Sequence, residues 1–450
     1  MITILKRPSK YSPVYNPSYW QFKTDKSNIL SFKLRVIDHS NAGIISTQLL
    51  YPTPKFISGS YFDISKIMLN YLTWEINNDP VKLIVPLSKS VKAYTVEITE
   101  QLLVEGNIVD GDSWNNASDP CFVWRSELGR IEFNSYSQVK YLINPTGLSS
   151  FLTNAPNFKL TTDISAEHLY FLQDNSVPDL KVRIRTYSGN GILIKTEIES
   201  IPSLDQFKMF RLNISPKALN EYFNLKFDNV KYYTVDLVDG LFNPKTTERV
   251  YLYEKSNCSL EYVNVLWENR LGGFDSYSFV APSDQIDVAR TILKKNIYQL
   301  DSNDVYTDIR DQVYNPSEVI INSSQELSTK LHSLQLTDAE GLWLAELYSS
   351  KQVFVELGDG ALVPVMLMNN SYQIPRTKYR KNEPNTISID IKMGEGIIPA
   401  KAQGYSDRKG NIDFIDSQMN SIGSGLPGWG INPHTQPSEY DDSDYGPDYA

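Results

Sequence analysis

Hydrophobic and polar residues alternate along much of the chain, and this pattern predicts a mainly β protein. In residues 31–38, SFKLRVID, the side chains of Phe32, Leu34 and Val36 point to one side, as in a half-buried strand. Further strands are predicted in residues 91–100, in 181–198 as a hairpin around Gly189–Gly191, in 232–254 as a second hairpin, and in 385–393. Strands at this spacing, with little helix between them, indicate β-sandwich or barrel-like modules rather than βαβ units.

Two segments have helical spacing instead. Residues 62–72 predict a helix with Asp63 or Ser65 as its N-cap. The stretch TDAEGLWLAELYSS begins with Thr337 and Glu340 in the register of a capping box, and it predicts a longer helix. The expected fold class is therefore mainly β and multi-domain, with a few short helices and an extended C-terminal tail.

Length and composition place this chain among folded proteins of several domains. It has 450 residues, 41% of them hydrophobic and 21% charged, and its 28 Tyr outnumber its 18 Phe, which favours strands and contact surfaces. We predict an N-terminal β-rich domain with an extended arm, a central β-sandwich-like domain, an α+β domain and an acidic tail. Their predicted bounds are 1–150, 151–300, 301–400 and 401–450.

The charge balance argues against nucleic acid as a direct ligand, because the formal net charge is −10. One basic cluster with an aromatic residue inside it, RTKYRKNEP at 376–384, is interpreted as a charged edge in contact with solvent. The first residues lack the apolar core of a signal peptide, and no apolar run is long enough to span a bilayer. We therefore expect folding in the cytoplasm and no membrane partner.

Candidate metal and catalytic residues are few. The segment 106–120 collects Gly, Asp, Asn and Pro and predicts a long surface loop, but it lacks the glycine and closing glutamate of a calcium loop. We expect no metal and no cofactor. The isolated cysteines and histidines are interpreted as buried thiols and as hydrogen-bonded or surface side chains: Cys121, Cys258, His39, His168, His332 and His434.

The stretch VLWENRLGGFDSYSF, residues 265–279, contains two adjacent glycines, Gly272 and Gly273. A phosphate-binding loop would need a helix after the glycines, whereas alternating aromatic residues follow them and predict a strand. A nucleophile elbow would need a serine between them. A structural turn is the remaining interpretation, because glycine enters positive-φ backbone at little cost, and we expect a β-branched residue at Gly273 to clash.

Three aromatic residues are predicted to anchor the core or an interface. Trp267 and Phe274 flank the glycine turn and are expected to pack across it, and Trp343 lies on the longer predicted helix. At the other end of the chain, no Lys or Arg follows Lys409, and the close is SEYDDSDYGPDYA. Such a segment cannot bury enough apolar surface to fold alone. We predict that it acts in assembly through Tyr440, Tyr445 and Tyr449.

Several of these segments resemble a known family. The motifs are YSPVYNPSYWQF followed by FDISKIMLNYL, then VLWENRLGGFDSYSF, then WLAELYSSKQVFVELGDGALVPVML. Together they look like virion tail structural proteins of bacteriophages that infect Bacteroidetes, including crAss-like phages, over residues 11–395. The resemblance implies a β-rich, multi-subunit tail component without enzymatic activity.

The leading hypothesis is a non-enzymatic ring, connector or baseplate-type tail protein, located in the virion and assembled in the cytoplasm of the bacterial host. Its partners would be further copies of itself, in a ring, and neighbouring virion tail proteins. The alternative is a tail-tip protein that binds a host surface glycan or receptor, or cleaves a glycan. Exposed aromatic residues and scattered carboxylates would supply the stacking and acid–base groups.

Overall fold

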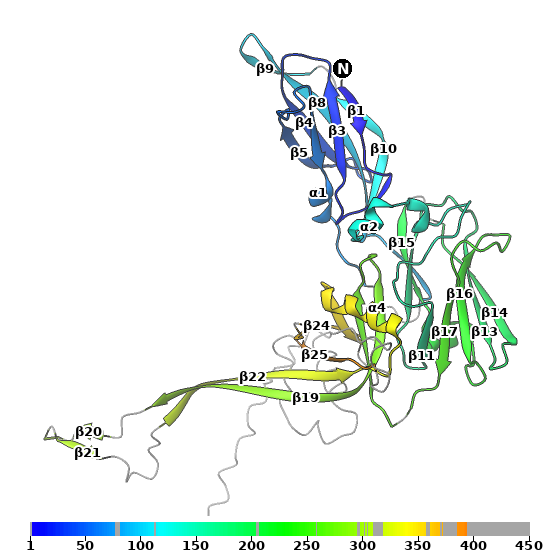
Figure 1. Ribbon diagram of the computed structural model, residues 1–450, viewed down its shortest axis with the longest axis vertical. Coiled ribbons are helices and arrows are strands. Elements are labelled where there is room, and N and C mark those ends of the chain that lie inside the picture. The colour runs from blue at the N-terminus through cyan, green and yellow to red at the C-terminus, as the bar shows by residue number, and fades with distance from the viewer. Residues whose placement is uncertain are drawn as a thin grey trace, which may run out of the picture. The chain divides into compact units, whose positions relative to one another are not determined.

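A computed structural model of the chain (Figure 1) confirms the mainly β fold, with sandwich-like sheets, a closed barrel and short helices. The chain forms two compact units, which are made of residues 1–285, 328–355 and 364–392, and of residues 286–327, 356–363 and 393–450. The predicted division into domains stays a prediction. The structure describes residues 2–76, 82–111, 114–203, 207–257, 259–294, 298–300, 302–303, 305–308, 318–356, 361–369, 371 and 385–393.

The N-terminal part of the first unit contains two sheets that enclose one core. Its residues come from both sheets and include Trp20, Phe22, Phe32, Leu34 and Val36, all almost fully buried. The smaller sheet has the order β1 (Ile2–Lys6), β3 (Tyr19–Thr24), β6 (Gly59–Asp63). The larger sheet has the order β2 (Tyr11–Pro13), β10 (Asn115–Trp124), β8 (Val91–Val104), β4 (Ile29–Asp38), β5 (Ile44–Leu50), and β9 (Asn107–Asp110) also pairs with β8.

A second pair of sheets follows in the same unit and shares another core. Phe171 and Phe210 stack in it at 5.2 Å between ring centroids, and the predicted hairpins are confirmed as β13–β14 and β16–β17. The first sheet has the order β11 (Phe158–Thr162), β17 (Arg249–Glu254), β16 (Tyr232–Val238), β13 (Lys181–Tyr187), β14 (Leu193–Ser200). The second has the order β12 (His168–Gln173), β15 (Lys208–Asn213), β7 (Ile84–Leu87).

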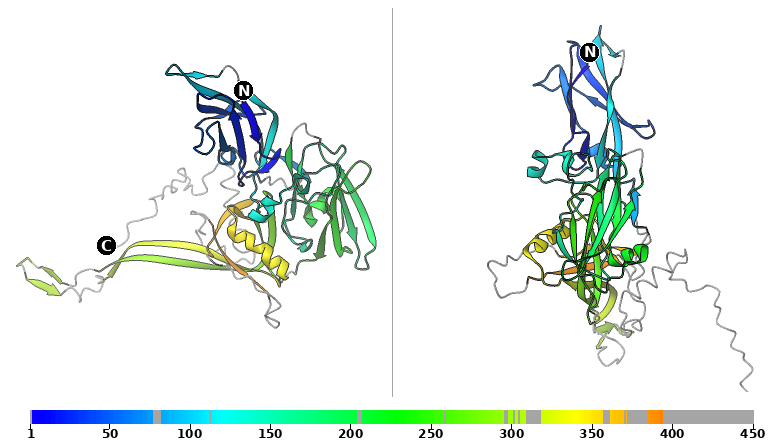
Figure 2. Two further views of the ribbon diagram at one scale, coloured as in Figure 1. Left: turned by 45° about the horizontal axis from the view of Figure 1, so that its top comes forward. Right: turned by 90° about the vertical axis from the view of Figure 1, so that its right-hand side faces the viewer.

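The later strands close into a barrel. Its order is β18 (Tyr262–Glu268), β19 (Phe274–Lys294), β22 (Glu318–His332), β25 (Ser388–Met393), β24 (Leu362–Leu367), β23 (Val353–Glu356). The alternating isoleucines predicted in residues 385–393 are buried. Figure 2 shows α4 (Asp338–Ser349, yellow) beside the barrel strands, where Trp343 of the helix meets Trp267 of β18 at 5.0 Å between ring centroids. A further strand pair joins β20 (Tyr298–Leu300) to β21 (Tyr306–Asp308).

The helices follow the local signals only in part. α4 begins with the predicted capping box: Glu340 N donates to Thr337 Oγ1 at 3.2 Å, and Thr337 N donates to Glu340 Oε2 at 2.8 Å. The helix predicted over 62–72 is shorter, because 59–63 belong to strand β6. Among the described residues the α-helices are α1 (Ser65–Leu69), α2 (Arg130–Asn134), α3 (Pro216–Phe223) and α4. In the described part of the chain, no helix combines the length and hydrophobicity that crossing a bilayer requires.

The prediction of a surface loop over 106–120 is wrong. Residues 107–110 form β9 and residues 115–124 form β10, and both pair with β8. β8 has 14 residues, so it offers backbone donors and acceptors along a length that exceeds its pairing with β4 alone. The polar composition of the segment predicts a loop, but the ladder of hydrogen bonds to β8 overrides that local preference.

Candidate functional site

The two glycines lie in the turn of the β18–β19 hairpin, where Glu268 pairs with Phe274. Gly272 has φ of +95°, and a Cβ there would lie 2.1 Å from the carbonyl oxygen of Arg125. Gly273 does not adopt a positive φ; a Cβ there would lie 2.8 Å from the Tyr170 ring and 3.0 Å from the Leu152 carbonyl oxygen. Gly272 is therefore required by backbone conformation and close packing, and Gly273 by close packing.

Asn269 organises this turn with its side chain. Its Oδ1 accepts hydrogen bonds from Leu271 N at 3.0 Å and Gly273 N at 3.1 Å, as in an Asx turn. Its Nδ2 donates to the Leu152 carbonyl at 2.8 Å and to Asp275 Oδ1 at 3.0 Å. The amide thus uses both of its ends to connect the turn to a neighbouring segment and to the start of β19.

Asp275 links the turn to helix α4. Its Oδ2 accepts from Trp343 Nε1 at 2.7 Å, and both residues are buried. Trp267 lies opposite Asp275 in the strand register, on the face of the hairpin that meets Trp343. Cross-strand partners share a face, so Phe274, which pairs with Glu268, lies on the other face. The expected packing of Trp267 against Phe274 is therefore wrong, because their side chains point to opposite sides.

Phe274 instead contacts Tyr170 and Phe354, with ring centroids 6.3 and 5.9 Å apart. The three predicted anchors Trp267, Phe274 and Trp343 are all buried.

A buried ion pair lies next to this network. Lys159 Nζ is 2.6 Å from Glu167 Oε2 and donates to the Ser276 carbonyl at 2.6 Å, and its ammonium stands 5.1 Å from the Trp343 ring centroid. The side chains of Lys159 and Glu167 are only 5% and 4% exposed. Burial raises the pKa of Glu167, while Lys159 acts against that shift. The two buried charges compensate each other, which is typical of an ion pair that holds segments of the fold together.

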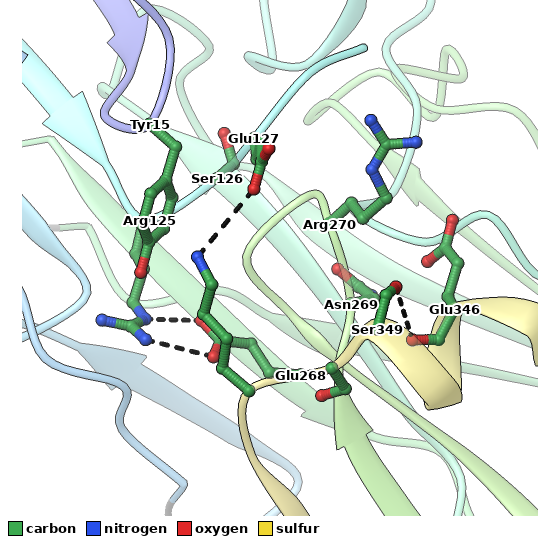
Figure 3. A pocket seen from close by; sticks show the side chains of 11 residues that line it. Tyr15, Arg125, Ser126, Glu127, Glu268, Asn269, Arg270, Glu346 and Ser349 are labelled. Atoms are coloured by element: carbon green, nitrogen blue, oxygen red, sulfur yellow. Dashed lines mark hydrogen bonds and ion pairs between the residues drawn. The ribbon is translucent and has the colours of Figure 1, made fainter. Parts of the chain in front are cut away.

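A second ion pair lines the small pocket shown in Figure 3. Arg125 Nε is 2.5 Å from Glu268 Oε1, and its Nη2 donates to Glu268 Oε2 at 3.2 Å, so the pair is bidentate. Lys351 lies 3.5 Å from the centroid of the Tyr15 ring and 3.9 Å from Glu127 Oε2. These contacts join the strand region around β10 to the end of β18 and the residues after α4.

Glu346 of α4 is the unusual carboxyl group of this pocket. Burial, together with the nearby charge of Asp275, raises the pKa of Glu346 to about 7. Asn154 Nδ2 donates to Glu346 Oε1 at 2.6 Å, whereas Oε2 is buried and has no hydrogen-bond partner among the described residues. A perturbed carboxyl group in a pocket is a candidate acid. However, the pocket has a volume of about 40 Å³, which suits a water molecule and not a substrate.

The remaining predicted residues give no catalytic arrangement among the residues that the structure describes. His168 is partly buried, with its Nδ1 fully buried, and burial lowers its pKa. His332 Nδ1 lies 2.8 Å from Ser388 Oγ, and His39 is exposed. Cys121 is buried and free, with its pKa raised by burial, as expected of a structural thiol. The described ranges also contain no group of three His, Cys, Asp or Glu side chains that could hold a metal ion.

Some predicted sites lie outside the described residues. They are Cys258, His434, the basic cluster 376–384, and the tail tyrosines Tyr440, Tyr445 and Tyr449.

Sequence reasoning missed most of the partners in this network. Asn269 carried a usable signal, because an Asn shortly before glycines is typical of an Asx turn. The pairs Arg125–Glu268 and Lys159–Glu167, and the environment of Glu346, carried none, since each depends on residues brought together by the fold.

Comparisons with known proteins leave the function open. No family model matches the sequence, and no curated protein matches it. Among solved structures, the crystal structure of Dpr2 Ig1-Ig2 in complex with DIP-Theta Ig1-Ig3 is similar at 8% identity and a TM-score of 0.14, covering 57% of this chain and 99% of that chain. CBD12 from CALX1.2 is similar at 8% identity and a TM-score of 0.18, covering 56% and 98%.

The Parabacteroides merdae beta-glucuronidase is similar at 10% identity and a TM-score of 0.14, covering 58% of this chain and 29% of that chain. TM-scores this low carry no argument about fold family, ligand or partner.

Proposed function

We propose that this protein is a non-enzymatic structural component of a bacteriophage tail, of the ring, connector or baseplate type, which assembles with further copies of itself and with other virion proteins. The sequence resemblance motivates the proposal. The structural observation that carries it is the exposed apolar surface of strands β19 and β22.

β19 has 21 residues, and its burial changes along its length. Residues 274–280 are buried or partly buried, whereas almost every later position is exposed. Ile286, Val288, Arg290 and Ile292 occupy alternate positions and therefore share one face of the strand, which is apolar apart from Arg290. Ile286 is 51% exposed and Ile292 is 52% exposed. In the neighbouring strand β22, Ile321 is 63% exposed.

Such a surface fits a contact between subunits. A two-stranded ribbon is at best marginally stable in water by itself, and soluble monomers rarely leave apolar stripes uncovered. In a ring, each copy contacts the next through two different surfaces. The exposed part of β19 and its neighbour β22, called the apolar ribbon below, would be one of these surfaces, and a complementary patch on the next copy would be the other. The structural character of the described polar networks also fits a protein that acts by assembly.

The test replaces the apolar stripe and measures assembly. Light scattering and negative-stain images of the full-length wild-type chain should show closed rings. The variant Ile286→Thr/Val288→Thr/Ile292→Thr keeps β-branched side chains but should lower the molar mass. The control Ile57→Thr/Ile131→Thr/Leu241→Thr changes apolar residues outside β19 and β22 that are even more exposed, and it should keep the rings.

Two results would contradict the proposal. One is a wild-type chain that stays monomeric at every concentration. The other is the absence of this chain from purified virions analysed by mass spectrometry.

A second candidate function, recognition of a host surface glycan, is favoured by the outer face of the sheet that contains β11, β17, β16 and β13. A shallow cavity of about 390 Å³ there is lined by Phe158, Tyr187, Tyr232, Thr234, Glu248, Val250 and Leu252. The rings of Tyr187 and Tyr232 stack at 4.6 Å, and Arg185 Nη2 is 2.7 Å from Glu248 Oε1. Aromatic rings beside charged hydrogen-bonding groups can pack against a sugar ring and hold its hydroxyls.

A glycan array separates this candidate from the first. Binding that is lost in Phe158→Ala and Glu248→Gln, and kept in the exposed control Tyr222→Ala, would support it. Absence of any glycan signal for the wild-type chain would remove it.

A further inference from the structure

A sizeable cavity lies in the N-terminal part of the first unit. It has a volume of about 690 Å³, within the range of sites that bind ligands or peptide segments. It lies between the end of β1, the segment that leads through β2, and helix α2. Its lining is Lys6, Arg7, Pro8, Ser9, Ser12, Asn16, Pro17, Ser18, Tyr19, Leu128, Arg130, Phe133, Asn134 and Tyr136.

The lining is basic although the chain as a whole is acidic. Lys6, Arg7 and Arg130 line the cavity, and the described residues that line it include no Asp or Glu. Arg7 pairs with Asp119 at 3.3 Å, but both side chains are at least half exposed, so solvent screens this pair. Lys6 and Arg130 are exposed and make no ion pair within the described part of the chain. The cavity therefore has positive charge that is available to an acidic partner.

The walls of the cavity are held in place by hydrogen bonds. Asn16 Nδ2 donates to the Leu128 carbonyl at 2.9 Å, and Leu128 N donates to Asn16 Oδ1 at 2.7 Å. Tyr136 Oη donates to the Tyr11 carbonyl at 2.6 Å, and its ring stacks on Phe133 at 6.3 Å. A preformed wall of this kind lowers the entropic cost of binding. Tyr19, which is 40% exposed, adds a further aromatic surface.

The sequence contains a segment of complementary chemistry. Residues 438–450, SEYDDSDYGPDYA, carry no Lys or Arg. Their acidic residues are Glu439, Asp441, Asp442, Asp444 and Asp448, and three tyrosines lie among them. Carboxylates match the cations of the cavity, and tyrosine rings match its aromatic wall. A short acidic peptide can therefore use both the charged and the aromatic parts of the lining.

We propose that the basic cavity lined by Lys6 and Arg130 is the docking site for the acidic segment 438–450 of a second copy of this chain. This inference rests on the proposed function, because it supplies a second contact between copies, separate from the apolar ribbon. The contact is of the head-to-tail kind, in which the segment of one copy engages the cavity of the next.

The test measures binding of a fluorescently labelled synthetic peptide, residues 438–450, by anisotropy. The receptor is the full-length chain with Glu439→Gln, Asp441→Asn, Asp442→Asn, Asp444→Asn and Asp448→Asn, so that its own segment does not compete. We expect saturable binding that weakens when the salt concentration is raised. Adding Lys6→Gln/Arg130→Gln to this receptor should weaken binding by at least about tenfold, since two facing cations are lost.

Matched controls separate this site from general charge attraction. Lys55→Gln/Lys66→Gln removes the same charge from exposed positions outside the cavity and should leave the affinity unchanged within about twofold. The labelled peptide with amides in place of its carboxylates should not bind.

Exchange between copies is tested with two full-length chains. The first chain carries the five amide substitutions in residues 438–450, so it keeps the cavity but lacks the acidic segment. The second chain, Lys6→Gln/Arg130→Gln, keeps the acidic segment but lacks the two cations of the cavity. Co-precipitation of the two differently tagged chains, stronger than either chain's self-association, would support docking between copies.

Three outcomes would overturn this inference: no peptide binding, equal loss of binding in the Lys55→Gln/Lys66→Gln control, or binding of inorganic phosphate that the peptide does not displace. Rings that persist in the Lys6→Gln/Arg130→Gln variant, without peptide binding, would refute the docking and leave the proposed ring intact. A wild-type chain that stays monomeric would instead refute the proposed function.

Discussion

Asn269 and Gly273 are hydrogen-bonded in both directions across the turn of the β18–β19 hairpin. Asn269 N donates to the Gly273 carbonyl at 2.9 Å, and Gly273 N donates to Asn269 Oδ1 at 3.1 Å. Because Asn269 also reaches Leu152 and Asp275, the turn fixes the relative positions of three segments. The glycines thus allow close packing between the hairpin turn and its neighbouring segments, beside the polar pocket of Figure 3.

The two glycines should respond differently to substitution. Gly272→Ala should destabilise the protein by more than about 3 kcal/mol, because it adds a Cβ at positive φ and forces it into the Arg125 carbonyl. Gly273→Ala should cost about 1–3 kcal/mol, since the Tyr170 ring must move. Chemical denaturation measures both. Gly189→Ala is the control, because a Cβ there meets nothing within 4 Å; an equal loss of stability in all three variants would refute the steric argument.

The hydrogen bond from Trp343 to Asp275 should stabilise the protein beyond what burial of the indole ring contributes. Trp343→Phe keeps an aromatic ring but removes the donor to a buried carboxylate, so we expect a loss of about 2–3 kcal/mol in the free energy of unfolding. Trp74→Phe is the matched control, because Trp74 is 37% exposed and contacts Phe354 through its ring. Similar losses in the two variants would show that the bond to Asp275 contributes little.

The ion pair between Arg125 and Glu268 should be costly to break on one side. Arg125→Gln leaves the carboxylate of Glu268, whose side chain is 8% exposed, without its bidentate partner. We expect a loss of about 3 kcal/mol in the free energy of unfolding. In Arg7→Gln the partner Asp119 is 66% exposed, and the loss should stay below about 1 kcal/mol. Denaturant midpoints that shift equally in both variants would contradict this difference.

Glu346 should make stability depend on pH. Its pKa is raised to about 7, so the folded protein holds a proton that the unfolded chain releases from about pH 4.5 upward. The free energy of unfolding should therefore fall by about 3 kcal/mol as pH rises from about 4.5 through 7, and level off above about pH 8. Glu346→Gln should remove this slope, as measured by denaturation between pH 4.5 and 8.

The test compares how the free energy of unfolding changes with pH in the wild type and in the Glu346→Gln variant, because other groups also titrate in this range. The lowered pKa of His168 acts in the opposite sense, making stability rise as pH increases towards its ordinary value of 6.5. An exposed control, Glu221→Gln, should keep the wild-type slope. A Glu346→Gln variant with that same slope would show that Glu346 titrates normally.

Local signals in the sequence predicted the elements that depend on neighbouring residues. Strand β4 follows from alternation within ten residues, the β13–β14 hairpin follows from a short glycine-containing turn, and the capping box of α4 needs only Thr337 and Glu340. The glycine turn was identified for the same reason, although which glycine takes the positive φ was decided by the backbone around Arg125.

The sequence by itself therefore determined the β character of this protein, its principal helix and its turn chemistry, because backbone dihedrals and side-chain periodicity depend on a few adjacent residues. Only the tertiary structure decided which strands pair, including the polar segment that became β10. It also placed Arg125 beside Glu268, 143 positions away, and gathered Lys6 and Arg130 around one cavity. These contacts, and the raised pKa of Glu346, arise from burial and proximity between distant segments, which no local pattern encodes.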